Sequence, residues 1–213
     1  PPRSTPKPSS AASDVYKRQF LHGLRQLADE NDLLLIFDEV QTGCGRTGKW
    51  FGYQYFDVIP DVITLAKSMS AGYAGGAMLP TTEIDPSLRP GMHAATFGGN
   101  PIASVAGIAT LEMIEEQNLL GNVSVLADLF QTRFNQLQME CEWIREVRVA
   151  GMMVGVELEV EGASVVQQCL DRNLLINCTQ GNVIRLLPAM NLTVDEANEG
   201  VDILSDVLSN LQA

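Results

Sequence analysis

Basic residues are scarce in this chain of 213 residues. It carries 14 Lys and Arg against 26 Asp and Glu, and its formal net charge is −12. Proteins held to nucleic acid by phosphate contacts need positive charge, and so do proteins that bind anionic membrane surfaces. The composition therefore argues against both classes. The exception is local, because residues 1–19 hold four basic side chains and one acidic side chain.

Long apolar runs and paired cysteines are also lacking. No stretch approaches the roughly 18 apolar residues of a membrane span, and the first twenty residues lack the apolar core of a signal peptide. No two cysteines form a C-x-x-C pair, and the residues that might join a metal site are few: Cys44, Cys141, Cys169, Cys178, His22 and His93. We therefore expect no metal, no membrane partner and a location in the reducing cytoplasm, while a disulfide stays open at this point.

The first 19 residues differ in texture from the rest. They are rich in Pro, Ser and basic residues and have almost no large aliphatic side chains, reading PPRSTPKPSSAASDVYKRQ. Such a segment buries too little apolar surface to fold, so we predict a disordered tail over residues 1–19. The letters SAASDVYKRQ also resemble translated adapter sequence that is sometimes fused to sequencing fragments. On that reading the tail is not native and the chain is a fragment.

From Phe20 to about residue 120 the pattern is that of an α/β domain. Apolar residues at helical spacing over 20–31 precede the continuous run LLLIF at 33–37, and two further short runs follow at 61–66 and 74–79. Short apolar runs separated by helices and glycine loops predict buried strands of a mostly parallel sheet. Residues 101–137 predict long helices that are interrupted near 120–122.

Residues 121–213 predict a smaller α+β domain. Strands are expected over 145–159, 174–179 and 182–188, and helices over 164–173 and 194–211. The expected architecture is therefore a large, mostly parallel α/β domain followed by a small C-terminal domain.

Two charged residues each follow a predicted strand. Asp38 closes the run LLLIF, and Lys67 directly follows DVITLA. Open α/β sheets bind their ligands at the carboxyl ends of strands, so both side chains are expected at one sheet edge. Taken alone, Asp38 has the simpler role of a cap or an ion-pair partner, and Lys67 that of a lysine extended into solvent. Taken together, they are the amine and carboxylate that pyridoxal phosphate requires for its aldehyde and its ring nitrogen.

The surrounding sequence resembles a known family. Residues 36–72 read IFDEVQTGCGRTGKWFGYQYFDVIPDVITLAKSMSAG, which is similar to the signature of the class III pyridoxal-phosphate aminotransferases. The later segments HAATFGGNP and NVIRLLPAMNLT resemble two further motifs of that family, in the same order, and are most similar to its acetylornithine branch. The resemblance covers residues 20–213 and implies a fold-type I pyridoxal-phosphate transferase, of which residues 20–120 are the later part of the large, cofactor-binding domain.

The resemblance also implies roles for individual residues. Lys67 is expected to hold the cofactor aldehyde as an imine and then to move the substrate proton as a general base. Asp38 is expected to pair with the protonated ring nitrogen, and Gln41 to hydrogen-bond near the phenolic oxygen. Glu39 and Val40, which complete the DEVQ motif, are also expected among the cofactor-binding residues.

Three further residues are expected at the site through the later motifs. Thr96 is implied to reach the cofactor phosphate of a neighbouring subunit, which makes a homodimer the expected assembly. Arg185 is expected to bind a substrate carboxylate through its planar guanidinium. Ala95 stands where the acetylornithine enzymes usually carry a hydroxyl residue that touches substrate, and this departure bears on the substrate more than on the cofactor.

The implied reaction is transfer of the terminal amino group of N-acetylornithine to 2-oxoglutarate, as in arginine biosynthesis. Other class III activities stay open, on succinylornithine, ornithine or 4-aminobutyrate, as does a cofactor-free interaction protein. A second departure is the segment 68–72, SMSAG, where the family prefers a run like GLGGG. The family's first half, with its phosphate-binding turn, has no counterpart here, so we predict that the 213-residue chain alone is inactive.

Overall fold

The structure is a computed structural model that describes residues 10–211, with side chains from Arg18 onward. It divides into two compact units. The first comprises the described residues up to Gly45 together with Lys49–Gln117, and the second comprises Arg46–Gly48 together with the chain from Asn118 onward. The division at residues 117 and 118 lies three residues before the expected one. The assignment of Arg46–Gly48 to the second unit was not indicated by the sequence pattern.

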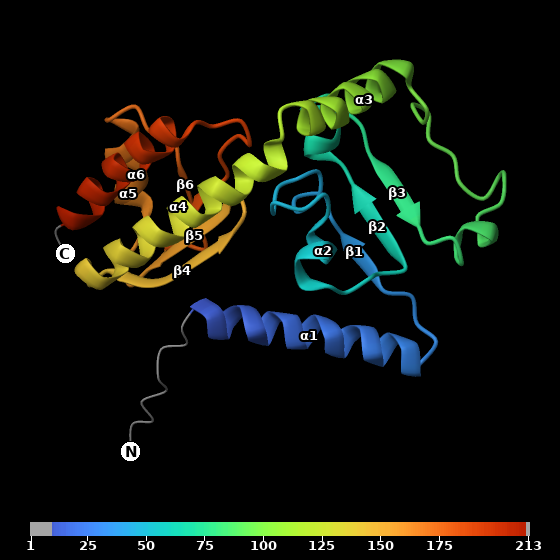
Figure 1. Ribbon diagram of the computed structural model, residues 1–213, viewed down its shortest axis with the longest axis horizontal. Helices are drawn as coiled ribbons and strands as arrows, with labels where there is room; N and C mark the ends of the chain where they lie inside the picture. The colour runs from blue at the N-terminus through green and yellow to red at the C-terminus, as the bar shows by residue number, and fades with distance from the viewer. Residues whose placement is uncertain (1–9, 212–213) are drawn as a thin grey trace. The chain divides into compact units, whose positions relative to one another are not determined.

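The first unit is built around a three-stranded sheet (Figure 1). Its elements in chain order are α1 (Ser10–Glu30), β1 (Ile36–Asp38), α2 (Gly52–Phe56), β2 (Val62–Leu65), the 3-10 turn η1 (Lys67–Ser70), β3 (Ala77–Pro80), the 3-10 turn η2 (Asp85–Ser87) and α3 (Pro101–Glu116). The strand order is β1-β2-β3, with β1 parallel and β3 antiparallel to β2. The three expected strands are present, and the sheet is mixed where a mostly parallel one was expected.

Helix α1 begins ten residues earlier than the sequence pattern indicated. Residues 10–19, which we assigned to a disordered tail, belong to α1, and residues 1–9 lie outside the described part of the chain. No Pro or Gly interrupts residues 10–22, and Ala, Lys, Arg and Gln among them favour a helix. Arg18 also donates hydrogen bonds to the backbone oxygens of Tyr55 and Phe56, at 3.0 and 2.9 Å. The helix propensity of residues 10–22 therefore outweighs the polar composition from which a disordered tail was predicted.

Particular residues mark the start of α3 and the break between α3 and the next long helix. Asn100 caps α3 by accepting hydrogen bonds from the backbone amides of Ile102 and Ala103, and Pro101 occupies the first helical position, where its missing amide costs nothing. Asn118, with φ of 49°, separates α3 from α4 (Leu119–Glu140). The interruption expected near 120–122 therefore occurs two to four residues earlier.

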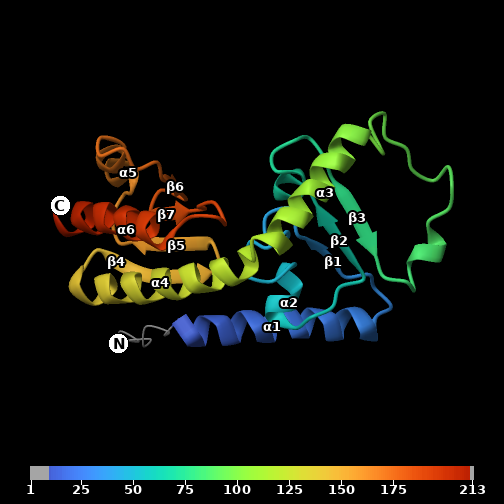
Figure 2. The same cartoon turned by 45° about the horizontal axis from the view of Figure 1, so that its top comes forward.

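The second unit packs helices on one face of a four-stranded antiparallel sheet (Figure 2). After α4 come β4 (Ile144–Ala150), β5 (Met153–Leu158), α5 (Ala163–Leu170), β6 (Asn177–Thr179), β7 (Val183–Leu186) and α6 (Val194–Ser209), and the strand order is β4-β5-β7-β6. Fully buried side chains from the sheet and helices form its core, among them Phe134, Val156 and Leu204. The predicted α+β character of this part agrees with the structure.

Apolar side chains remain exposed in the first unit. They include Leu33, Leu34 and Ile36 around β1, Met78 and Leu79 in β3, and Ile102, Val105, Ile108, Leu111 and Met113 in α3. The run LLLIF was expected to be buried, but β1 is an edge strand and more than half of the Ile36 surface is accessible within the described residues. Across residues 10–211, none of the helices is long and apolar enough to cross a membrane.

Candidate functional site

The two residues that carried the sequence argument lie at one edge of the first sheet. Strands β1 and β2 run parallel, with Asp38 opposite Thr64 in register, and Lys67 begins η1 three residues beyond Thr64. The Thr64 hydroxyl donates to Asp38 Oδ1 at 3.2 Å, as does the amide of Val40 at 3.0 Å. Each residue therefore lies at the end of a strand at one edge of the sheet, as expected, and the two strands are parallel neighbours.

The backbone at Lys67 is unusual. Its φ of 46° is a left-handed conformation that a side chain with a Cβ rarely adopts, and Ala66 before it is fully extended. Such strain persists only where the surroundings enforce it, and it concentrates at functional sites. Here Ser70, at the end of η1, is buried and its hydroxyl lies 3.4 Å from the backbone oxygen of Ala103 in α3. A Cβ at Gly75 would come within 2.8 Å of that hydroxyl, so the turn after Lys67 packs closely.

Glu39, next to Asp38, is turned into the protein. Only 3% of its surface is exposed. One carboxylate oxygen accepts hydrogen bonds from the Gly52 amide and the Thr42 hydroxyl, and the other accepts from the Tyr53 amide, with 2.7 Å to each amide. The carboxylate therefore binds the free amides at the start of α2 and closes the loop that follows β1.

The remaining expected residues of the first unit lie on exposed segments. Gln41 is exposed two residues beyond Glu39, and Ala95 and Thr96 are exposed in the loop that leads to α3. The amide of Gly98 donates to the Ala95 oxygen at 3.0 Å, which forms the tight turn that the letters TFGGNP indicated. Among the expected site residues of this unit, those that lie together at one sheet edge are Asp38, Val40 and Lys67.

Arg185 belongs to the second unit. It lies in β7, directly opposite Gly155 of β5 and Asn177 of β6. Its side chain forms no ion pair or hydrogen bond within the described residues, and it is among the residues that line an open groove of about 380 Å³. An unpaired guanidinium on a strand is available to a ligand, as the carboxylate role requires.

One contact was not apparent from the sequence. Arg46, in the run GCGRTG at residues 43–48, donates a hydrogen bond to the backbone oxygen of Pro188, two residues beyond β7, and its own oxygen accepts from the Met152 amide. Burial lowers the pKa of Arg46. The turn glycine Gly151, with φ of 60°, accommodates this approach, because a Cβ there would lie 2.4 Å from the Arg46 oxygen. The sequence of this segment does not indicate the partner, because Pro188 lies 142 residues further along the chain.

The Cys44 thiol lies in the loop that follows β1. Burial, together with the nearby Glu39 carboxylate, raises the pKa of the Cys44 thiol, so Cys44 is a poor nucleophile at neutral pH. Throughout residues 10–211, no three His, Cys, Asp or Glu side chains gather closely enough to hold a metal ion.

Comparison with known proteins identifies the family. The model of the aminotransferase class III family matches residues 6–208. The chain belongs to this family. It is 43% identical over 195 residues to the acetylornithine aminotransferase of Caldanaerobacter subterraneus, and 41% identical over 192 residues to that of Methanothermobacter thermautotrophicus. These alignments cover 91% and 90% of this chain and 49% of each relative, so the chain spans about half the length of the curated class III aminotransferases that it matches.

Solved structures of aminotransferases superpose on this chain. The acetylornithine aminotransferase of Elizabethkingia anophelis superposes with a TM-score of 0.84 at 30% identity, covering 91% of this chain and 52% of that one. The ornithine delta-aminotransferase of Plasmodium falciparum gives a TM-score of 0.83 at 28% identity, covering 90% and 51%. The chain therefore has part of the fold of the pyridoxal-phosphate-dependent aminotransferases.

The residues present fit the cofactor of this family, pyridoxal 5′-phosphate. Asp38 Oδ1 already accepts two hydrogen bonds, which orient the carboxylate, while Oδ2 accepts none within the described residues and is available for a ring N–H. Lys67, exposed at the same strand edge, supplies an amine for the aldehyde. The left-handed backbone conformation of Lys67 is shared by seven other non-glycine residues of the described chain, among them Ala71 at the end of the same turn.

Proposed function

We propose that this chain forms the lysine-bearing half of an enzyme that transfers the terminal amino group of N-acetylornithine to 2-oxoglutarate. The observation that carries the proposal is the placement of Asp38 and Lys67 at the ends of two adjacent parallel strands, with Lys67 held in a left-handed backbone conformation. If Lys67 only extended into solvent, its role would require neither the left-handed backbone nor a carboxylate at the neighbouring strand end.

The chain's own residues divide the work of such a site. Bound pyridoxal phosphate supplies the electron sink for the negative charge that develops at the substrate carbon. The Lys67 amine holds the cofactor and then carries the proton between the two carbons that exchange it. The Asp38 carboxylate keeps the ring nitrogen protonated, and the Gln41 amide orients the phenolic oxygen. Arg185 binds a substrate carboxylate.

The choice of N-acetylornithine rests on the relatives. Acetylornithine aminotransferases match at 37–43% identity over about nine tenths of this chain. Among the superposed structures, an acetylornithine aminotransferase is 30% identical and an ornithine aminotransferase 28% identical. Ala95 is the position that most bears on this choice, because it lies beside Thr96 in the exposed TFGGNP turn. A single altered contact in a substrate pocket changes preference by one or two orders of magnitude.

The assembly that we propose is a homodimer in the cytoplasm. Thr96 lies on an exposed loop, where its hydroxyl is free to reach the cofactor phosphate of a second copy. The acidic composition, with a net charge of −12, is consistent with a protein that takes no nucleic acid.

The test uses the complete polypeptide encoded by the gene that contains this chain. We expect glutamate to form from 2-oxoglutarate with N-acetylornithine at a kcat/KM at least about tenfold above that with ornithine or 4-aminobutyrate. A higher rate with either competitor would reject the substrate assignment. The 213-residue chain itself is expected to form no glutamate, and measurable turnover by it would contradict its assignment as half of a site.

A further inference from the structure

A three-residue segment of the second unit, Arg46–Gly48, is held by the turn between β4 and β5. The Met152 amide donates to the Arg46 oxygen at 2.9 Å. Gly151 permits this approach, because a Cβ there would lie within 2.6 Å of backbone atoms of Arg46 and Thr47. Thr47 is buried, with 7% of its surface exposed. The main chain at Arg46 is therefore fixed, and its side chain extends from a defined position.

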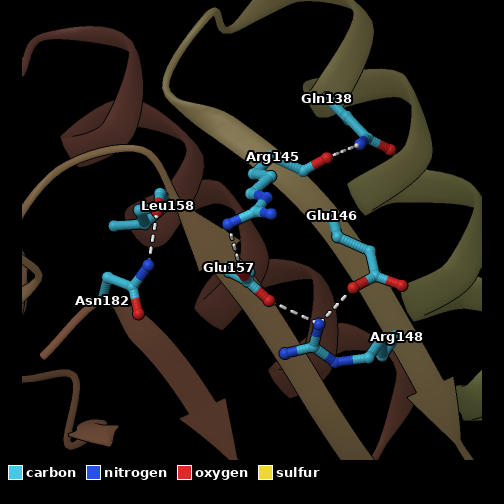
Figure 3. A network of polar contacts seen from close by, with 7 residues as sticks. All are labelled: Gln138, Arg145, Glu146, Arg148, Glu157, Leu158 and Asn182. Carbon is cyan, nitrogen blue, oxygen red and sulfur yellow. Dashed lines mark hydrogen bonds and ion pairs between the residues drawn. The ribbon is translucent and has the colours of Figure 1, made fainter. Parts of the chain in front are cut away.

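The hairpin that carries this turn is stabilised by a charged network on its two strands (Figure 3). Glu146 of β4 lies opposite Glu157 of β5, and Arg148 Nη1 donates to both, at 2.6 Å to Glu157. Arg145 pairs with Glu157 at 3.1 Å. Two carboxylates directly opposite one another repel, so the bridging guanidinium stabilises the pairing of the strands. Partial burial works to lower the pKa of Arg148, but the hydrogen bonds to both glutamates outweigh it and raise that pKa.

The end of the hairpin away from the turn is tied to neighbouring elements. Gln138 of α4 donates to the backbone oxygen of Arg145 at 2.9 Å, and Asn182, just before β7, donates to that of Leu158 at 2.8 Å (Figure 3). The turn that holds Arg46 therefore belongs to a hairpin that is fixed along its length.

The Arg46 side chain contacts the loop between β7 and α6. It donates to the backbone oxygen of Pro188, and it forms no ion pair within the described residues. Burial lowers the pKa of Arg46, because loss of water disfavours the charged form. A methionine would fill similar space without that cost, so the contribution particular to the guanidinium is its hydrogen bond to Pro188.

Pro188 lies just beyond the point where β7 loses a neighbouring strand. Arg185 is the last residue of β7 that pairs with strands on both sides, and Leu186 pairs with β5 alone. Pro188 follows two residues later and lines the same groove as Arg185. Asn122 donates to two later oxygens of this loop, at 2.7 and 3.0 Å. The bond from Arg46 is therefore the side-chain contact that fixes the loop nearest to Arg185 within the described residues.

We propose that Arg46 is a positioning residue for Arg185. By fixing the oxygen of Pro188 it holds the end of β7, and the Arg185 guanidinium then keeps the direction in which it meets a ligand. Arg46 acts through the strand end and touches no ligand itself. The consequence for a substrate carboxylate rests on the proposed function, whereas the fixing of the loop does not.

Hydrogen exchange of the 213-residue chain, followed by mass spectrometry, tests the fixing of the loop. In Arg46→Met the peptide covering residues 185–192 should exchange at least about fivefold faster, because the strand end opens more often. A peptide from α4, residues 126–137, should be unchanged. The matched control is Arg172→Met, which removes another guanidinium of this unit, bonded to Asp206, and it should leave both peptides unchanged.

Two outcomes of this experiment would overturn the proposal. One is equal exchange of the loop peptide in Arg46→Met and in the unchanged chain. The other concerns Arg46→Gln, which removes the charge and is too short to bond Pro188, and which replaces Arg46→Met if that variant fails to fold. Loop exchange in Arg46→Gln that is no faster than in the unchanged chain would show that Asn122 and the strand pairing fix the loop without Arg46.

The action through Arg185 is tested by a double-mutant cycle in the complete polypeptide. The acceptor is 2-oxoglutarate, and the donor is whichever of N-acetylornithine, ornithine and 4-aminobutyrate gives the highest turnover. Arg46→Met should raise the KM for 2-oxoglutarate at least about fivefold and change kcat less than about twofold, because Lys67 and Asp38 keep their places. In a polypeptide that already carries Arg185→Met, adding Arg46→Met should have no further effect on kcat/KM.

Additive effects of the two substitutions would overturn the proposal, because a purely structural role of Arg46 would lower activity in both backgrounds. Highest turnover with a donor other than N-acetylornithine would reject the substrate assignment and leave the cycle valid. If the complete polypeptide transfers no amino group, the proposed function fails, and the exchange experiment alone decides whether Arg46 fixes the strand end.

Discussion

Two adjacent acidic residues at the end of β1 have opposite surroundings. Asp38 is exposed beside Lys67, whereas Glu39 is buried and binds the start of α2. Asp38 is the last residue of β1 and Glu39 directly follows it, and successive residues of an extended chain point to opposite sides. The cofactor contact expected of Glu39 stays a prediction. Its contacts favour a different task, which is to fix the loop that carries Gln41.

Substitution of this buried carboxylate tests that task. In Glu39→Gln, one of the two acceptor oxygens becomes an NH2 group that faces a backbone N–H, so at least one charge-assisted hydrogen bond is lost. We expect the free energy of unfolding to fall by about 2 kcal/mol, measured by urea denaturation of the 213-residue chain. Glu83→Gln, at an exposed position, should change it by less than about 0.5 kcal/mol. Equal effects of the two substitutions would show that the Glu39 contacts do not stabilise the loop.

Sequence reasoning at the residue scale located Asp38 and Lys67 because each directly follows a short apolar run. It could not locate the partners of Arg46 or Arg148. An arginine between apolar residues looks the same whether it faces solvent, a backbone oxygen or a glutamate pair. The pairings depend on strand register, and register is set by long-range packing that one-dimensional patterns do not contain.

At the scale of elements, α1 is tied to the sheet by one carboxylate. Asp61, at the start of β2, accepts a hydrogen bond from the Leu35 amide at 2.6 Å and pairs with Arg25 of α1 at 2.8 Å. Burial works to raise the pKa of Asp61, but the Leu35 amide and Arg25 together lower it. A carboxylate with a lowered pKa stabilises the fold at pH values above its unfolded pKa of about 4. That stabilisation is lost as the pH falls through the lower, folded-state value.

A pH comparison tests the link. Asp61→Asn should lower the free energy of unfolding by about 1 kcal/mol at pH 7, because the ion pair with Arg25 is lost. The difference from the unchanged chain should shrink when unfolding is measured at pH 3, where Asp61 itself becomes protonated in the unfolded state. Asp32→Asn, at an exposed position, provides the control and should show no such pH dependence. A difference that stayed constant between pH 7 and pH 3 would rule out the ion pair as its source.

Elements were predictable wherever local rules govern them. The strands near 36, 63 and 78, the capped start of α3 and the final helix all follow from apolar spacing and end signals. The antiparallel direction of β3 and the helical state of residues 10–19 did not follow. Strand direction depends on the path of the connecting loop, and the composition of residues 1–19 was dominated by the prolines of its first part.

At the scale of the whole molecule, the first unit has more apolar surface than its own contacts cover. Strands β1 and β3 each have an edge without a strand neighbour among the described residues, and α3 exposes large apolar side chains. Ile102, Val105 and Ile108 are between 57% and 65% exposed. A helix that is apolar on several sides is normally buried, and open strand edges invite pairing with other chains. The chain matches about half the length of its relatives, which is consistent with surface that the complete enzyme covers.

This surface predicts self-association of the 213-residue chain. Sedimentation velocity should show concentration-dependent species larger than a monomer, because apolar patches of this extent associate in water. The double substitution Ile102→Gln with Ile108→Gln should shift the distribution toward monomer. Glu115→Gln, a polar exchange on the same helix, should leave it unchanged. A monomeric unchanged chain, or a double variant that associates as strongly, would show that α3 is not the associating surface.

The central claim is that Lys67, placed beside Asp38 by β1 and β2, holds pyridoxal phosphate. The most direct test is the visible absorption spectrum of the complete polypeptide after incubation with pyridoxal phosphate and removal of the excess. We predict a visible band that borohydride removes, that Lys67→Ala abolishes and that Lys49→Ala, at an exposed lysine of the same unit, retains. A band that survives in Lys67→Ala, or a complete polypeptide that takes up no cofactor, would contradict the claim.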